Sequence, residues 1–168
     1  MPKTRRPRKG SLQFWPRKKA KKHVARVRAW SDKQGILGFL GYKVGMTHVQ
    51  FIDKNPKAIY KDQKTTAATI IECPPLKPFS LRFYSGSKIL SEIMAKNLDK
   101  ELRRKIIMPK KYNENIPQNY DQLALLVYSQ PKLVRIKKKP DIFEIKLNME
   151  LEEAKKLLEK DIKVNDVF

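Results

Sequence analysis

Residues 123–130 read LALLVYSQ, a nearly continuous apolar run that stops directly before Pro131. Such a run lacks the polar alternation of a half-exposed strand. The sequence therefore predicts a well-buried strand that ends before the proline, and weaker patterns lie on both sides of it.

Strand patterns flank this run. Residues 65–73, TTAATIIEC, predict a strand that stops at Pro74 and Pro75, because a proline pair breaks a hydrogen-bonded ladder. Residues 79–84 predict a short strand, and residues 142–147 predict another through their β-branched and aromatic content.

Residues 35–53 read GILGFLGYKVGMTHVQFID and predict two strands joined by a tight turn near residues 42–45. The spacing of the glycines does not fit the G-x-G-x-x-G pattern of dinucleotide sites, and no helix pattern follows. The glycines therefore favour sharp bends in the strands of a barrel.

The apolar period changes after Ser87. Apolar residues then recur at every fourth position: Leu90, Met94, Leu98, Leu102 and Ile106. This spacing predicts a helix that Ser87 caps and Pro109 ends, with its apolar face on the sheet rather than on a partner helix. A second helix is predicted to open at Asn148 or Met149 with acids in its first turn. Its predicted buried face comprises Leu151, Ala154, Leu157 and Leu158. Strands and helices together indicate the α+β class.

The first 30 residues form a basic arm. They contain twelve Lys or Arg and no acid, so the segment stays extended unless a polyanion neutralises it. Aromatic rings among the cations offer faces on which bases stack. The arm therefore predicts contact with RNA or DNA, and the alternative is a solubility tail or a nuclear-localisation run. The predicted contacts are Lys3, Arg5, Arg6, Arg8, Lys9, Phe14, Trp15, Arg17, Lys18, Lys19, Lys21, Lys22, His23, Arg26, Arg28 and Trp30.

The rest of the chain is basic as well. The formal net charge is +21, of which the arm carries +12, so residues 31–168 carry +9. A polyanion is therefore expected to touch more than the arm. Residues 133–139 mix apolar and basic side chains and predict either a second polyanion contact or a solvated loop. The candidate cations there are Arg135, Lys137, Lys138 and Lys139. A membrane surface is disfavoured because the arm has no amphipathic basic helix.

Catalytic and metal-binding patterns are missing from the sequence. Cys73 is the single cysteine, which excludes an intrachain disulfide and a cysteine zinc cluster and favours a reducing interior. His23 and His48 lack a nearby nucleophile or paired carboxylate, and no P-loop or H-E-x-x-H occurs. No apolar run is long enough for a signal peptide or a membrane span. We therefore expect a soluble binding protein rather than an enzyme, with no cofactor, metal or small-molecule substrate.

Five stretches, in this order and spacing, resemble the ribosomal protein L-three family of the large subunit in its archaeal and eukaryotic-type form. They are RPRKGSLQFWPRKKAKKHVARVRAW (6–30), GILGFLGYKVGMTH (35–48), KNLDKELRRKI (96–106), QPKLVRIKKKPDIFEIKL (130–147) and LLEKDIKVNDVF (157–168). The resemblance covers nearly the whole chain. It implies a structural protein that binds large-subunit ribosomal RNA, supports subunit assembly and shapes the region near the peptidyl-transferase centre. Neighbouring ribosomal proteins and a cytoplasmic location are implied too.

The resemblance also implies a domain organisation. A basic RNA-binding extension spans 1–34, the first strands of a small β-barrel of translation-protein type span 35–75, and an inserted α/β region spans 76–142. Residues 143–168 supply a strand, a helix and a tail. In the family the chain runs on into the second part of the barrel, including a glycine- and lysine-rich loop near the catalytic RNA. An open half-barrel would leave its edge strands unpaired, so we expect a second polypeptide to carry the rest of the barrel. The alternative is a shortened protein that closes its sheet with its own strands or against RNA.

Two rival hypotheses belong to other classes. A sequence-specific DNA-binding regulator requires a recognition helix with basic residues on one face, and a nucleic-acid-modifying enzyme requires a cofactor loop or an acid cluster. Neither pattern is visible in the sequence.

Overall fold

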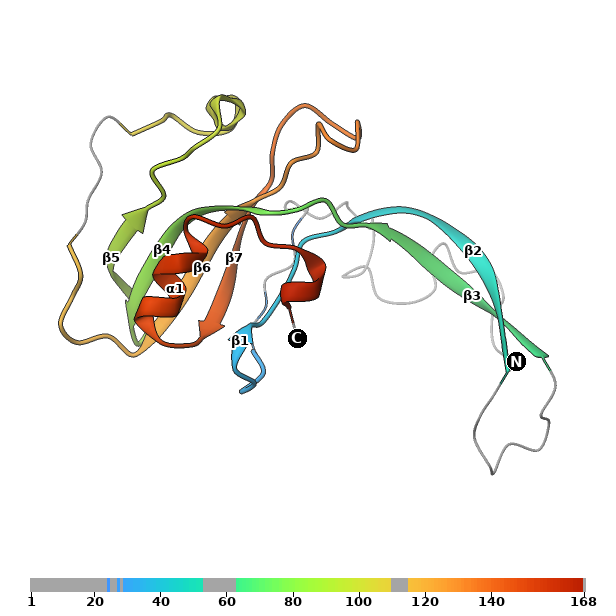
Figure 1. Cartoon of the computed structure of the whole chain (residues 1–168), viewed down its shortest axis with the longest axis horizontal. Helices are drawn as coiled ribbons and strands as arrows, with labels where there is room; N and C mark the ends of the chain where they lie inside the picture. The colour runs from blue at the N-terminus through green and yellow to red at the C-terminus, as the bar shows by residue number, and fades with distance from the viewer. Residues whose placement is uncertain (1–23, 25–26, 28, 53–62, 110–114, 168) are drawn as a thin grey trace, which may run out of the picture.

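The computed structural model describes residues 24, 27, 29–52, 63–109 and 115–167. Its body is a five-stranded antiparallel sheet with the strand order β1-β7-β6-β4-β5 (Figure 1). The strands are β1 (Gly35–Ile36), β4 (Lys77–Ser85), β5 (Lys88–Met94), β6 (Gln122–Tyr128) and β7 (Ile142–Asn148). A separate two-stranded ribbon projects from this body and consists of β2 (Tyr42–Ile52) and β3 (Gln63–Glu72).

The predicted buried strand is confirmed as the middle strand of the sheet. β6 pairs with β4 on one edge and with β7 on the other, and every residue from Leu123 to Tyr128 is buried. The strands predicted over residues 65–73, 79–84 and 142–147 are confirmed as β3, β4 and β7. At these positions the local content of apolar and β-branched residues was enough to predict the strands.

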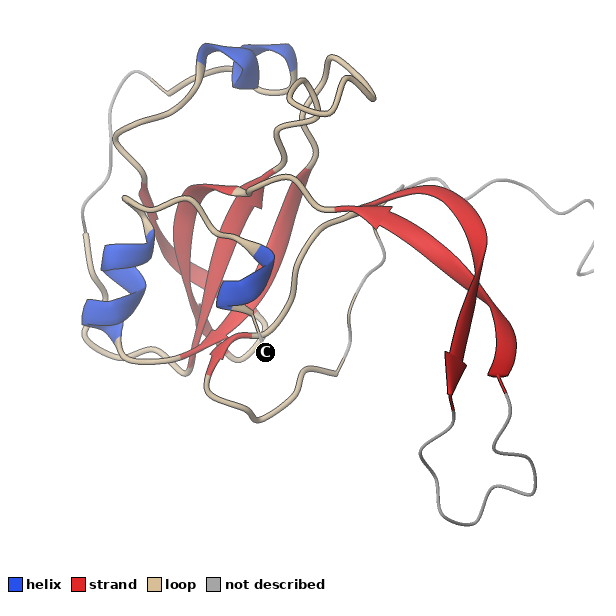
Figure 2. Ribbon diagram, turned by 45° about the vertical axis from the view of Figure 1, so that its right-hand side comes forward, coloured by secondary structure: helices blue, strands red, loops and turns tan. Residues whose placement is uncertain are grey.

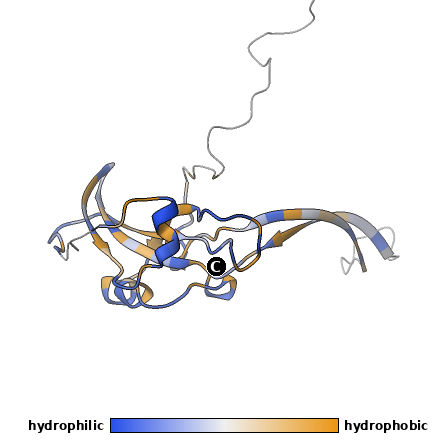
Figure 3. Cartoon of the chain, turned by 90° about the horizontal axis from the view of Figure 1, so that it is seen from above, coloured by the Kyte–Doolittle hydropathy of each residue, from blue (hydrophilic) through white to orange (hydrophobic). Residues whose placement is uncertain are grey.

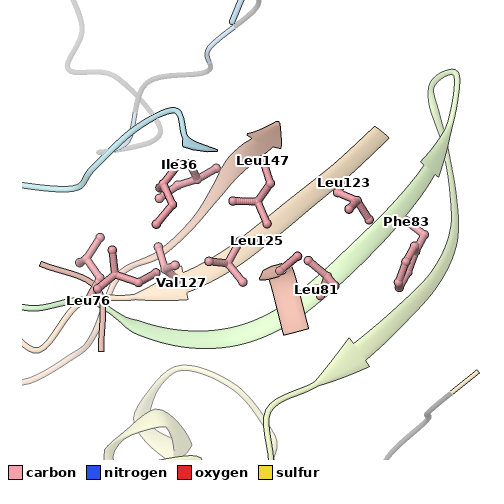
Figure 4. Packing of buried hydrophobic residues seen from close by; sticks show 11 residues of the cluster. Ile36, Leu76, Leu81, Phe83, Leu123, Leu125, Val127 and Leu147 are labelled. Atoms are coloured by element: carbon pink, nitrogen blue, oxygen red, sulfur yellow. The ribbon is translucent and has the colours of Figure 1, made fainter. Parts of the chain in front are cut away.

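The larger core lies on one face of the sheet. Figure 4 shows side chains from β4, β6 and β7 gathered there with Ile36 and Leu76. The helix α1 (Leu151–Leu157) packs on this face through the fully buried Ala154. The second predicted helix is thus confirmed, although it begins at Leu151 rather than at Asn148 or Met149. The C-terminal segment crosses the same core, where Leu76 and Ile162 exchange backbone hydrogen bonds of 2.9 and 2.8 Å.

The opposite face holds a smaller core and a polar network. Phe79, Leu126 and Tyr128 pack there around Leu102 of the 3₁₀ helix η2 (Lys100–Arg104). Farther along the strands, the Arg82 guanidinium bridges Glu92 at 2.9 Å and Glu144 at 3.4 Å. One cation therefore joins β4 to its neighbour β5 and, across β6, to β7.

The helix predicted over residues 87–108 is wrong. The chain instead makes β5, then η2. A four-residue apolar spacing also places residues on one face of a strand, because four is a multiple of the strand period of two. Gly86, with a φ of 56°, supplies the left-handed backbone of the two-residue connection that folds β5 back on β4. The edge of β4 that does not pair with β6 offers backbone hydrogen bonds to this segment, which favours a strand over a helix.

The tight turn predicted near residues 42–45 is also wrong. β2 runs through this segment with a register shift between Lys43 and Gly45, which is a β-bulge opposite β3. Just before β2, the connection from β1 contains Gly41. There the backbone of Gly41 passes so close to β3 that an added Cβ would meet the Ile71 side chain at 2.5 Å. Figure 2 shows the resulting ribbon curving away from the body.

The described strands do not close into a barrel, so the fold is α+β with an open sheet and a separate ribbon. Within the described part of the chain, no helix has the length and apolar content needed to cross a membrane.

Candidate nucleic-acid interface

Most of the predicted contacts lie outside the described residues. These are Lys3, Arg5, Arg6, Arg8, Lys9, Phe14, Trp15, Arg17, Lys18, Lys19, Lys21, Lys22, His23, Arg26 and Arg28. The structure does place Trp30 and the four cations of the loop between β6 and β7. Their surroundings differ sharply.

Trp30 is partly buried and packs against the larger core. Its ring lies beside the backbone of Gly38, where an added Cβ would come within 3.2 Å of it. The ring also lines a cavity of about 630 Å³ with Tyr84, Phe143 and Lys146. Much of its surface is therefore used within the protein, and its role as a stacking surface for bases stays a prediction.

The loop that connects β6 to β7 has a defined backbone. Leu133 donates to the Gln130 carbonyl at 3.1 Å, Arg135 donates to Lys132 at 3.2 Å, and Ile136 donates to Pro131 at 3.2 Å. The last two bonds form the nested pair of a Schellman motif, which ends a helical turn with one left-handed residue. Arg135 occupies that position with a φ of 54°.

The base of the loop is fastened to the ribbon. The Tyr42 hydroxyl, at the start of β2, lies 2.7 Å from Ser129 Oγ and donates to Asp141 Oδ2 at 2.9 Å. The Asp141 amide donates to the same Ser129 oxygen at 2.9 Å. Burial raises the pKa of Tyr42 to about 12, with Asp141 adding to the rise and the Ser129 hydrogen bond opposing it. We call Tyr42, Ser129 and Asp141 the anchor.

Sequence reasoning missed the anchor. Tyr42 is separated from its two partners by 87 and 99 residues, and none of the three belongs to a local motif. Only the return of the chain along β6 and β7 brings them together.

The four predicted loop cations divide into two kinds. Lys137 forms an ion pair with Asp141, and its Nζ lies 5.6 Å from the centre of the Tyr42 ring. Arg135, Lys138 and Lys139 are exposed, and no carboxylate of the described residues pairs with them. Lys137 therefore holds the loop to the anchor, while the charges of the other three side chains are exposed and are not neutralised by a described carboxylate.

The ribbon presents a different surface. Apolar side chains along it are between 44% and 63% exposed: Val44, Met46, Val49, Phe51, Ile52, Ile70 and Ile71. Figure 3 shows apolar residues along both of its strands. Its described residues include two lysines and one glutamate. This surface suits apolar contact with polypeptide better than contact with phosphates.

Comparison with known proteins identifies the family of the chain. The family model described as ribosomal protein L3 matches residues 1–168. The large ribosomal subunit protein uL3 of Methanobrevibacter smithii is 37% identical over 187 residues, which cover 96% of this chain and 54% of the relative. Those of Methanocaldococcus jannaschii and Archaeoglobus fulgidus are 39% and 37% identical over 97% of this chain and 55% of each relative. The chain thus spans about half the length of the curated relatives it matches. A family match along the whole chain shows that it belongs to the ribosomal protein L3 family.

Proposed function

We propose that the chain is a structural constituent of the large ribosomal subunit, acting in translation by binding large-subunit ribosomal RNA. The family match over residues 1–168 carries this proposal. The net charge of +21 supports it, because a polyanion is the natural partner of such a protein. Its relatives are named as large ribosomal subunit proteins, which favours this role over a DNA-binding regulator or a nucleic-acid-modifying enzyme. The same role places it in the cytoplasmic ribosome, beside neighbouring ribosomal proteins.

Binding rests on two basic elements in this proposal. The cations of residues 1–30 neutralise phosphates, while Phe14, Trp15 and Trp30 offer rings to bases. Arg135, Lys138 and Lys139 add a second contact on a loop whose backbone is already ordered. The anchor supports this second contact, since a loop fixed before binding loses less entropy when it binds.

The ribbon has a separate role in the proposal. Its apolar faces are covered by strand-forming polypeptide from outside this sequence, on a second polypeptide as the resemblance predicts or on a continuation of the same chain. With those strands β2 and β3 form part of a small barrel. A bare two-stranded ribbon supports the need for cover, because such a ribbon is at best marginally stable in water.

Salt dependence of RNA binding tests the role of the arm. The logarithm of the affinity should fall with the logarithm of salt concentration, by about 0.7 to 0.9 per phosphate contact. Deletion of residues 2–23 should flatten this dependence and leave Trp30 in the core. The matched comparison is Trp15→Ala, which should weaken binding by about 1 to 3 kcal/mol without changing the salt dependence. An unchanged slope after the deletion would exclude the arm as the main contact.

Hydrogen exchange tests the covering of the ribbon. In the isolated chain the amides of β2 and β3 should exchange much faster than those of β6, because one partner strand is all that protects them. In intact ribosomes the amides of β2 and β3 should become protected. Equal exchange of the ribbon in both states would contradict the proposal, and β6, already buried, serves as the internal control.

A further inference from the structure

The segment that follows β5 presents cations that are not part of the loop described above. Leu102 of η2 is fully buried against Phe79, Leu126 and Tyr128. Its carbonyl accepts from the amides of Lys105 at 2.9 Å and Ile106 at 3.0 Å. These contacts fix the backbone of the turn, and Arg103, Arg104 and Lys105 lie exposed on its outer side.

The carboxylates in and around this turn already have partners. Asp99 pairs with Lys77 at 2.9 Å, and Glu101 pairs with Lys132 at 2.7 Å. Among the described residues, no ion pair joins Arg103, Arg104 or Lys105 to an acid. The three positive charges are therefore not neutralised within the described part of the protein.

The turn and the loop between β6 and β7 lie at the same end of the sheet (Figures 1 and 2). The ion pair between Glu101 and Lys132 links them directly. A cavity of about 540 Å³ lies between them, lined by residues of both segments, including Lys100 and Arg135. One basic surface therefore extends over both segments, and its unpaired cations are Arg103, Arg104, Lys105, Arg135, Lys138 and Lys139.

We propose that Arg103, Arg104 and Lys105 form an RNA-binding site that extends the surface of the β6–β7 loop and takes the phosphate backbone of large-subunit RNA. This inference rests on the proposed function. Two adjacent guanidinium groups on a fixed turn suit phosphates, because each can donate two parallel hydrogen bonds. Ile107, which is 96% exposed, lies beside them and offers apolar contact to a ribose or a base. The surface around α1 lacks this character, since Glu150, Glu152, Glu153 and Glu159 alternate there with lysines.

A charge-neutralising triple variant tests the site in the whole chain. Arg103→Gln, Arg104→Gln and Lys105→Gln together remove three charges from exposed side chains. The matched control, Lys155→Gln, Lys156→Gln and Lys160→Gln, removes three charges on and after α1. RNA affinity is measured with large-subunit ribosomal RNA fragments over a range of salt concentrations. Melting of both variants checks that the fold is kept.

The site variant should reduce the slope of log affinity against log salt by about 2 to 3, with a loss on the order of a hundredfold at 0.1 M salt. The control should change the slope by less than about 1. Equal effects of the two variants would overturn the site while leaving the proposed function intact. Absence of salt-dependent RNA binding by the unmodified chain would instead overturn the proposed function. RNA crosslinks confined to the loop, with none to residues 103–107, would also overturn the site.

Discussion

β6 and β2 are both rich in apolar residues, yet they have opposite surroundings. Six consecutive residues of β6 are buried, while nine of the eleven residues of β2 are exposed. β6 has a strand on each edge and a core cluster on each face. Among the described strands, β2 pairs only with β3. The sequence of a strand therefore sets how much apolar surface it has, and the neighbouring elements decide whether that surface is buried.

Cross-strand pairs deepen the contrast. In the body, Arg82 faces Glu92 across β4 and β5, and both side chains are partly buried. In the ribbon, Thr47 faces Ala68 and His48 faces Ala67. Small partners contribute little to the stability of a ribbon. These pairs therefore hold β2 to β3 less firmly than the Arg82–Glu92 pair holds β4 to β5.

The largest expected effect comes from a matched pair of truncations. Leu125→Ala in β6 should lower the free energy of unfolding by about 2 to 5 kcal/mol, because Leu125 is fully buried and a cavity would remain. Val49→Ala in β2 should lower it by less than about 1 kcal/mol, because Val49 is already 44% exposed. Denaturant unfolding of both variants measures the difference. Similar losses would mean that the ribbon is packed in the isolated chain and would break the comparison.

The same contrast explains what the sequence could predict. The run from Leu123 predicts a buried strand because its side chains are nearly all apolar and lack the polar alternation of a half-exposed strand. Residues 87–108 were ambiguous, since Leu90 and Met94 fit a helix face and a strand face equally. The decision between them came from β4, which supplies an edge and the partner Arg82 for Glu92. The anchor could not be predicted from the sequence either, because its three residues come into contact only after the sheet has formed.

Tyr42→Phe tests whether the anchor joins the ribbon to the body, and it should have an intermediate effect. The substitution removes the hydroxyl that contacts Ser129 and Asp141 and should cost about 0.5 to 1.5 kcal/mol at pH 8. Tyr120→Phe is the control, because its ring packs edge-on against Phe83 at 5.2 Å and the substitution keeps that ring. Faster hydrogen exchange in β2 with unchanged exchange in β6 would sharpen the comparison. Faster exchange throughout the body would contradict it.

The pH dependence of the same variant gives a second measurement. The folded pKa of Tyr42, about 12, lies above the ordinary value of 10.0. The neutral phenol therefore contributes stability that is fully present below pH 10 and is lost as the pH rises toward 12. Tyr42→Phe has no phenol to ionise, so its stability should decline less across this window than that of the unmodified chain. An equal decline would show that Tyr42 does not titrate in the folded state as the anchor requires.

The smallest expected effect concerns Arg135, which lies in the loop that the anchor ties to the ribbon. A left-handed backbone costs a side chain about 1 to 2 kcal/mol that glycine avoids, and Arg135 has a φ of 54°. Glycine gives back part of this gain through the greater freedom of its unfolded chain. Arg135→Gly should therefore raise the free energy of unfolding by about 0.5 kcal/mol.

Lys138→Gly is the control for this prediction. It is matched in charge, but Lys138 is not among the described residues with a positive φ, so the substitution should not stabilise the protein. Both variants lose one exposed cation and should weaken RNA binding to the same degree. If Arg135→Gly stabilises the protein and weakens RNA binding, the cation at position 135 contributes to RNA binding at a cost in folding stability. If both variants destabilise equally, the left-handed position stores no strain, and the order of the loop must come from the anchor alone.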